Sequence, residues 1–223
     1  MLSEEIVRQF IETQLPDSEN VALRNVREHI EKLKIDHEEI FRSQIDIIRT
    51  LLAIRQADSI LELGTFLGYS TLVFAEHATG RSPKGRVVTI EKELWRTNEA
   101  KKLIDATGFE DVVEFKVGDA AEECKALIAN HTSFDFIFLD TFEGTYPEMF
   151  PFCLELLNVS GILLIDNVLM PIARGWENGE NIIERSDGVF AALRRTLQLA
   201  TAAANFRTCI IPSGSGLLLG VKL

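Results

Sequence analysis

The chain has 223 residues and a formal net charge of −11. Because 46% of the residues are hydrophobic, it can bury a substantial core without disulfide or metal cross-links. It contains no run of 18 or more apolar residues, which excludes a membrane-spanning helix, and its acidic start MLSEEIVRQF lacks the basic and apolar regions of a signal peptide. The acidic balance argues against broad contact with nucleic acid phosphates, so a nucleic-acid partner is not expected. The three cysteines are widely scattered and read as reduced cytosolic thiols, so we expect a cytoplasmic protein.

The first part of the chain is predicted to be helical. A helix start is expected at Ser3, where an N-cap residue precedes two acids. Apolar residues then recur at helical spacing over 21–33 and 38–55. We therefore expect residues 1–57 to form an N-terminal helical cap and residues 58–223 to form the α/β core of one domain.

Apolar, β-branched runs alternate with helical segments after residue 57. The runs predicted as strands are residues 59–63, 86–90, 112–117, 134–139 and 161–165. The helices predicted between them are residues 70–78, 94–106, 120–129 and 146–157. Such alternation predicts βαβ units and a parallel sheet with helices on both faces.

The end of the chain has a different pattern. A last helix is predicted over residues 189–203. Residues 205–211 and 217–222 then form two apolar runs on either side of the turn sequence PSGSG, which is typical of a hairpin. We expect an antiparallel pair at the edge of the parallel sheet.

Acidic or amide side chains follow four of the predicted strands. These residues are Glu91, Asp119, Asp140 and the pair Asp166 and Asn167. In an open α/β sheet, ligands bind beyond the carboxyl ends of the strands, so all of these side chains are expected on one edge. Asp and Asn also commonly end strands and cap helices, which explains any one of them about as well. The recurrence at successive strands favours a binding edge.

The stretch LELGTFLGYS joins the first predicted strand to the next helix at the same edge. Gly64 and Gly68 are spaced as G-x-x-x-G, which differs from the dinucleotide pattern G-x-G-x-x-G and is weak evidence alone. Glu91 ends the second strand, where an acid can accept hydrogen bonds from ribose hydroxyls. A pyrophosphate fits poorly beside so many carboxylates. A cationic nucleoside cofactor fits best.

Five motifs now carry a resemblance to a known family. In order along the chain they read LELGTFLGYS, VVTIE, VGDA, FDFIFLD and GILLIDNV. From about residue 57 to the C-terminus the sequence resembles the S-adenosylmethionine-dependent O-methyltransferases of the catechol and caffeoyl-CoA type. The resemblance implies a Rossmann-like class I fold with seven strands and a C-terminal antiparallel hairpin. It also implies a small hydroxylated acceptor, and it leaves a homodimer open.

The resemblance also implies roles for individual residues. Those implied to bind S-adenosylmethionine are Glu62, Gly64, Gly68, Tyr69, Ser70, Glu91, Asp119, Ala120 and Asp140. Those implied to bind a divalent metal are Asp140, Asp166 and Asn167. Three hard oxygen ligands suit Mg²⁺ best, with Mn²⁺ or Ca²⁺ as alternatives.

The sequence departs from the family on the substrate side. Glu143 stands where the family usually has a lysine, three residues after Asp140, and we consider both residues candidate catalytic groups. Glu143 could act as a base, bind a cationic part of the acceptor or point into solvent. The turn at residues 213–216 also lacks the family's usual aspartate.

A long polar segment, residues 170–187, follows the predicted metal ligands. Long ordered loops beside a crevice are often lids, so Met170 and Trp176 are candidate substrate contacts. Two alternatives to a metal-dependent O-methyltransferase remain. One is a metal-independent methyltransferase of a carboxylate, an amine or a modified tRNA uridine. The other is a protein that binds S-adenosylmethionine without turnover.

Overall fold

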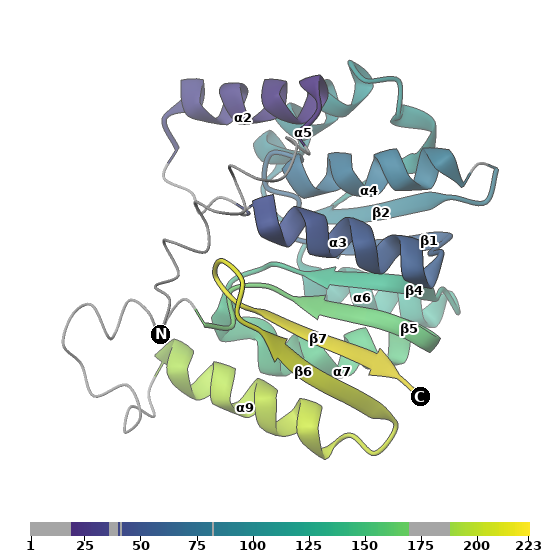
Figure 1. Cartoon of the computed structure of the whole chain (residues 1–223), viewed down its shortest axis with the longest axis vertical. Coiled ribbons are helices and arrows are strands. Elements are labelled where there is room, and N and C mark those ends of the chain that lie inside the picture. Colours follow the sequence, from purple (N-terminus) through teal and green to yellow (C-terminus); the bar gives the residue numbers. More distant parts are fainter. Residues whose placement is uncertain (1–18, 36–39, 41, 82, 170–187) are drawn as a thin grey trace.

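The computed structural model describes residues 19–35, 40, 42–81, 83–169 and 188–223. Its centre is a seven-stranded sheet in the order β3-β2-β1-β4-β5-β7-β6 (Figure 1). The strands are β1 (Ser59–Leu63), β2 (Arg86–Glu91), β3 (Val113–Val117), β4 (Phe134–Leu139), β5 (Leu157–Ile165), β6 (Phe206–Ile211) and β7 (Leu217–Lys222). Strands β1 to β5 pair in parallel, and β7 runs antiparallel to both β5 and β6. The predicted mixed sheet with a C-terminal hairpin is confirmed.

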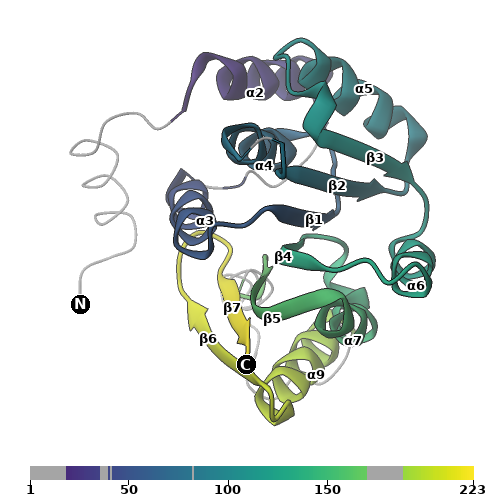
Figure 2. The ribbon, with the colours of Figure 1, turned by 90° about the vertical axis from the view of Figure 1, so that its right-hand side faces the viewer.

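Helices cover both faces of this sheet (Figure 2). One face carries α2 (Val21–Leu33), α3 (Arg42–Arg55), α4 (Tyr69–Gly80) and α5 (Leu94–Asp105). The other face carries α6 (Ala120–Ala129), α7 (Tyr146–Leu156) and α9 (Gly188–Ala202). Short 3₁₀ turns lie at η1 (Glu110–Val112) and η2 (Glu143–Thr145). Across the described ranges, no helix combines the length and the apolar character needed to cross a bilayer.

The central strands are buried on both faces, which explains their near-continuous apolar runs. Every residue of β1 and the last four of β4 are buried. On the α4 face the ring of Phe74 lies 5.9 Å from that of Phe136 and 5.6 Å from that of Phe138, measured between centroids. Glu62 of β1 breaks the pattern, because it is a fully buried carboxyl on the same face.

Strand β5 begins earlier than residue 161, where the sequence predicts its start. Leu157 already pairs with Phe134, and the register then shifts so that Phe136 pairs with Ile162. Ser160 has φ +61° inside this bulge. The sequence leaves residues 158–160 between the predicted helix and the predicted strand, whereas β5 absorbs them as an irregularity. The predicted helix at Ser3 and the segment 170–187 lie outside the described residues.

Candidate functional site

The corner after β1 is held by close backbone contacts. Gly64 N donates to the Ile90 carbonyl at 3.0 Å, and Asp140 N donates to the Leu63 carbonyl at 2.9 Å. Gly64 has φ +102°, and a Cβ built there would lie 2.0 Å from the Asp140 carbonyl oxygen. Only glycine satisfies both conditions. The end of β1 is therefore fixed directly against the end of β4.

The same corner continues into the first turn of α4. Gly68 is the N-cap residue of α4, with φ +88°, and a Cβ there would lie 3.1 Å from the Ala100 Cβ. Phe66 also adopts a positive φ of +48°, which is uncommon for a residue other than glycine. Its backbone N–H donates to Glu91 Oε2 at 2.9 Å. The loop thus presents the N-terminus of α4, a natural site for a carboxylate, beside Glu91.

Glu62 lies fully buried beneath this corner. Its carboxyl oxygens accept hydrogen bonds from the hydroxyls of Ser70, Thr71 and Thr89. Burial raises the pKa of Glu62 from 4.5 to about 7, although the three hydroxyls act in the opposite direction, and the charge of Glu91 adds to the rise. Because Ser70 and Thr71 belong to the first turn of α4, Glu62 ties the helix start to β1.

Glu91 forms one wall of the site with its neighbours. Its Oε1 accepts the backbone N–H of Glu93 at 3.0 Å, and Arg96 Nη1 lies 3.9 Å from the same oxygen. The Arg96 guanidinium lies 5.0 Å from the centroid of the Phe66 ring, within range of a cation–π contact. A carboxylate has about four lone-pair positions. Glu91 therefore keeps acceptor capacity for a bound hydroxyl.

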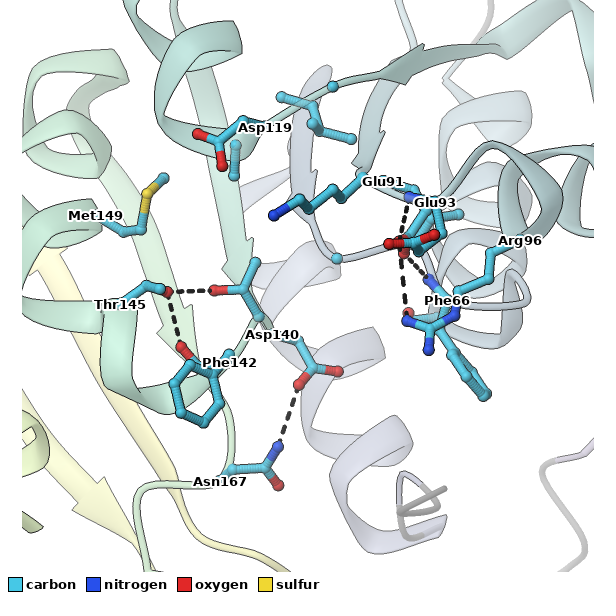
Figure 3. Close-up of a pocket in the computed structure, with 18 of the residues that line it drawn as sticks. Phe66, Glu91, Glu93, Arg96, Asp119, Asp140, Phe142, Thr145, Met149 and Asn167 are labelled. Carbon is cyan, nitrogen blue, oxygen red and sulfur yellow. Dashed lines mark hydrogen bonds and ion pairs between the residues drawn. The ribbon is translucent and has the colours of Figure 1, made fainter. Parts of the chain in front are cut away.

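Asp140, Asp166 and Asn167 meet at the ends of β4 and β5. Asn167 Nδ2 donates to Asp140 Oδ1 at 3.2 Å, and the two side chains point toward each other (Figure 3). Burial raises the pKa of Asp140 well above its ordinary value, and the charges of Asp166, Glu62 and Glu143 add to the rise. Burial also raises the pKa of Asp166, against hydrogen bonds that lower it. This end of the site concentrates negative charge.

A cavity of about 1000 Å³ connects these groups. Its volume is at the upper end for ligand sites, which suits a cofactor and an acceptor together. The predicted site residues that line it are Gly64, Tyr69, Ser70, Glu91, Asp119, Ala120, Asp140 and Asn167. The predicted residues that do not line it are Glu62, Gly68, Glu143 and Asp166. The candidate substrate contacts Met170 and Trp176 lie outside the described residues.

Several lining residues were not predicted from the sequence. On the wall formed by the helical cap these are Arg27, Ile30 and Ile40. Arg27 Nη2 donates to the Tyr69 hydroxyl at 3.0 Å, which ties α2 to the first turn of α4. Figure 3 shows Phe66 and Arg96 on one side of Asp140, and Phe142, Thr145 and Met149 on the other. Phe66 and Thr65 carried a local signal, because both lie between Gly64 and Gly68.

The structure does not show the predicted metal site. Within the part of the chain that the structure describes, no group of three or more His, Cys, Asp or Glu side chains is arranged to hold a metal ion. The predicted set differs from such a group because its third member, Asn167, is an amide. No lysine or arginine among the same residues forms an ion pair with Asp140 or Asp166.

Comparison with known proteins places this geometry in a family. A family model described as O-methyltransferase matches residues 13–223. The chain belongs to the O-methyltransferase family. The family predicted from the five sequence motifs is confirmed, and the O-methyltransferase match extends into the helical cap that those motifs do not reach.

Individual relatives agree with this family. The chain is 32% identical over 144 residues to a catechol O-methyltransferase of Mycobacterium tuberculosis, and this alignment covers 65% of the chain but only 60% of that enzyme. The O-methyltransferase from Bacillus cereus in complex with S-adenosylhomocysteine matches with TM-score 0.83 and 25% identity, over 98% of this chain and 97% of that one. TomG from Streptomyces achromogenes, in complex with S-adenosylmethionine, matches with TM-score 0.84 and 25% identity, over 100% of this chain and 99% of that one. These structures confirm the methyltransferase fold.

The raised pKa of Glu62 predicts a pH-dependent stability. Between 4.5 and about 7, the folded protein holds a proton that the unfolded chain releases, so the free energy of unfolding should fall as pH rises through this window. The loss from this one group is about 3 kcal/mol. Glu62→Gln cannot titrate and should remove that part of the pH dependence. Urea unfolding at the two ends of the window measures it, and equal pH dependence in variant and wild type would contradict the account.

Proposed function

We propose that this protein transfers a methyl group from S-adenosylmethionine to a hydroxyl oxygen of a small acceptor, with a divalent cation beside the acceptor. The observation that carries the proposal is one cavity lined both by the glycine corner and by Asp140 and Asn167. The cofactor in the solved relative TomG supports S-adenosylmethionine as the methyl donor. The catechol O-methyltransferase relative supports a hydroxylated acceptor.

The cofactor is proposed to lie along the corner. The N-terminus of α4, at Tyr69 and Ser70, would face the methionine carboxylate, because the first N–H groups of a helix attract anions. Glu91 would accept the ribose hydroxyls. Asp119 caps α6 through Oδ1, which accepts the N–H of Ala121 at 3.0 Å. Its second oxygen, Oδ2, would then accept a hydrogen bond from the adenine amino group beside Ala120.

The cation is proposed to lie among Asp140, Asp166 and Asn167. Asp166 is buried, and its charge contributes to the raised pKa of Asp140. Two neighbouring carboxylates are costly without a positive charge, and no described lysine or arginine forms an ion pair with either of them. Carboxylate and amide oxygens are the hard ligands that Mg²⁺, Mn²⁺ and Ca²⁺ accept. When bound, such an ion would lower the pKa of a coordinated acceptor hydroxyl.

The chain's own residues would mainly orient the reactants. S-adenosylmethionine supplies a methyl group that the sulfonium makes electrophilic. The acceptor oxygen forms the new C–O bond as the C–S bond breaks, and its proton leaves to a base. Asp140 would hold the acceptor end of the site at a fixed place relative to the corner, since backbone contacts join them. Phe142 and Met149 would provide apolar walls.

Loss of the Glu91 carboxylate should weaken cofactor binding. Glu91→Ala is expected to reduce the affinity for S-adenosylmethionine by about 1–3 kcal/mol, the value of a hydrogen bond to a charged group. Calorimetric titration measures the change, with circular dichroism to verify folding. Glu110→Ala, an exposed position away from the cavity, is the matched control. Wild-type affinity in Glu91→Ala would count against the cofactor assignment.

Removal of the cation should stop methyl transfer. Excess EDTA is expected to abolish product formation from catechol-like acceptors, and Mg²⁺ or Mn²⁺ should restore it. Asp166→Ala should lose activity while keeping most of its affinity for S-adenosylmethionine, because Asp166 does not line the cavity. Full activity in EDTA would support a metal-independent methyltransferase. Cofactor binding without product from a broad acceptor panel would support a non-catalytic protein.

Glu143 is proposed to alter acceptor preference. It begins the 3₁₀ turn η2 and is half-buried, and burial raises the pKa of its carboxyl, with a further contribution from Asp166. It lies outside the set of lining residues, but its charge contributes to the raised pKa of Asp140. A carboxylate here removes the positive field of the family's lysine and favours an acceptor other than a plain catechol.

Neutralising this charge tests the proposal. Glu143→Gln should lower kcat/KM on the preferred acceptor by at least about tenfold, or 1.4 kcal/mol, with cofactor affinity unchanged. Steady-state kinetics across an acceptor panel measures the effect. Glu155→Gln, at an exposed position of α7, is the control for a lost charge. Equal kinetics for Glu143→Gln and the wild type would show that this side chain has no role in the acceptor site.

A further inference from the structure

The carboxylate of Asp166 is held by three hydrogen-bond donors on one oxygen. Its Oδ1 accepts Gln44 Nε2, Ser215 Oγ and the backbone N–H of Asn167, each at 2.7 Å. Gln44 is fully buried and Asp166 is 3% exposed. One carboxylate oxygen has about two lone pairs, so these donors use all of its acceptor capacity. Oδ2 is the oxygen left for a ligand.

These donors come from segments that are far apart in the sequence. Gln44 lies in the first turn of α3, and Ser215 lies in the turn between β6 and β7, which runs beside α3 in both views (Figures 1 and 2). Gln44 Nε2 also donates to Ser215 Oγ at 3.0 Å. The Leu169 N–H donates to the Ser215 carbonyl at 2.9 Å. The helix, the turn and the segment after β5 therefore form one hydrogen-bonded unit around Asp166.

The chemistry of the donors distinguishes this unit from a structural salt bridge. An amide and a hydroxyl orient a carboxylate but leave its charge uncancelled. An arginine or lysine in the same place would neutralise Asp166 and compete with a cation. Neutral donors that fix a charged ligand are the usual outer shell of a metal site.

We propose that Gln44 and Ser215 are positioning residues that hold Asp166 for the divalent cation. The inference rests on the proposed metal site. Ser215 contributes through its hydroxyl, which donates to Asp166 Oδ1. Without Gln44 and Ser215, only the backbone N–H of Asn167 would hold the buried carboxylate, and its Oδ2 would be less firmly directed at one place.

Binding of Mn²⁺ alone tests the proposal without turnover. Gln44→Met and Ser215→Ala each remove one donor to Asp166. Ser213→Ala is the matched control, because Ser213 lies in the same turn but its hydroxyl bonds Ser43 at 2.7 Å. The Kd for Mn²⁺ is measured by the electron paramagnetic resonance of the free ion. The Kd for S-adenosylmethionine is measured by calorimetry without metal.

The expected result is selective. Gln44→Met and Ser215→Ala should each weaken Mn²⁺ binding about tenfold or more. Ser213→Ala and the hydroxyl-retaining Ser215→Thr should bind Mn²⁺ as the wild type does, and cofactor affinity should be unchanged in all four. A structural role alone would lower thermal stability without moving the Kd for Mn²⁺.

Two results would overturn the proposal, and they are distinguishable. Wild-type Mn²⁺ affinity in Gln44→Met and Ser215→Ala, together with its loss in Asp166→Ala, would reject the positioning role but leave the metal site intact. Unchanged Mn²⁺ affinity in Asp166→Ala would reject the site itself. Ser215→Ala decides the matter if Gln44→Met does not fold, because Ser215 lies in a partly exposed turn.

Discussion

The close approach of Gly64 to the Asp140 carbonyl is the contact on which the site depends. Any side chain at Gly64 would overlap that oxygen, and φ +102° is itself unfavourable for other residues. The contact leaves no freedom between the corner after β1 and the end of β4. A cofactor placed by the corner would therefore have a fixed relation to an acceptor placed at Asp140. For a reaction that needs an in-line approach, such rigidity is the main contribution that a protein can make.

The cost of this arrangement is a concentration of acids at one sheet edge. Glu62 and Asp166 are buried there, Asp140 lies partly buried beside them, and burial raises the pKa of each. Hydroxyl donors stabilise Glu62, whereas Asp166 relies on an amide, a hydroxyl and a backbone N–H. Neutral donors reduce the free-energy cost of burying these carboxylates without removing their charge. The proposed cation and the cationic cofactor are each expected to stabilise this edge when bound.

Features that depend on the spacing of apolar residues and on the order of the strands could be predicted from the sequence. Buried parallel strands have continuous apolar runs, and the residue after each strand must lie on one edge, so Glu91 and Asp140 could be placed together from the chain alone. Gln44 could not be found this way. It is one polar residue in an amphipathic helix, and its role depends on how α3 packs against a turn 171 residues away. The wall residue Arg27 was missed for the same reason, because α2 reaches the cavity only through tertiary packing.

The most direct test of the account uses Mn²⁺ as a paramagnetic probe of bound S-adenosylmethionine. Proton relaxation by Mn²⁺ falls steeply with distance, so the resonances of the cofactor report which end of it lies near the cation. With Asp140 beside the glycine corner and Asp119 at the far side, the sulfonium methyl protons should relax much faster than the adenine protons, and excess Mg²⁺ should reverse the effect. Adenine protons that relax as fast as the methyl protons, or faster, would contradict the proposed arrangement.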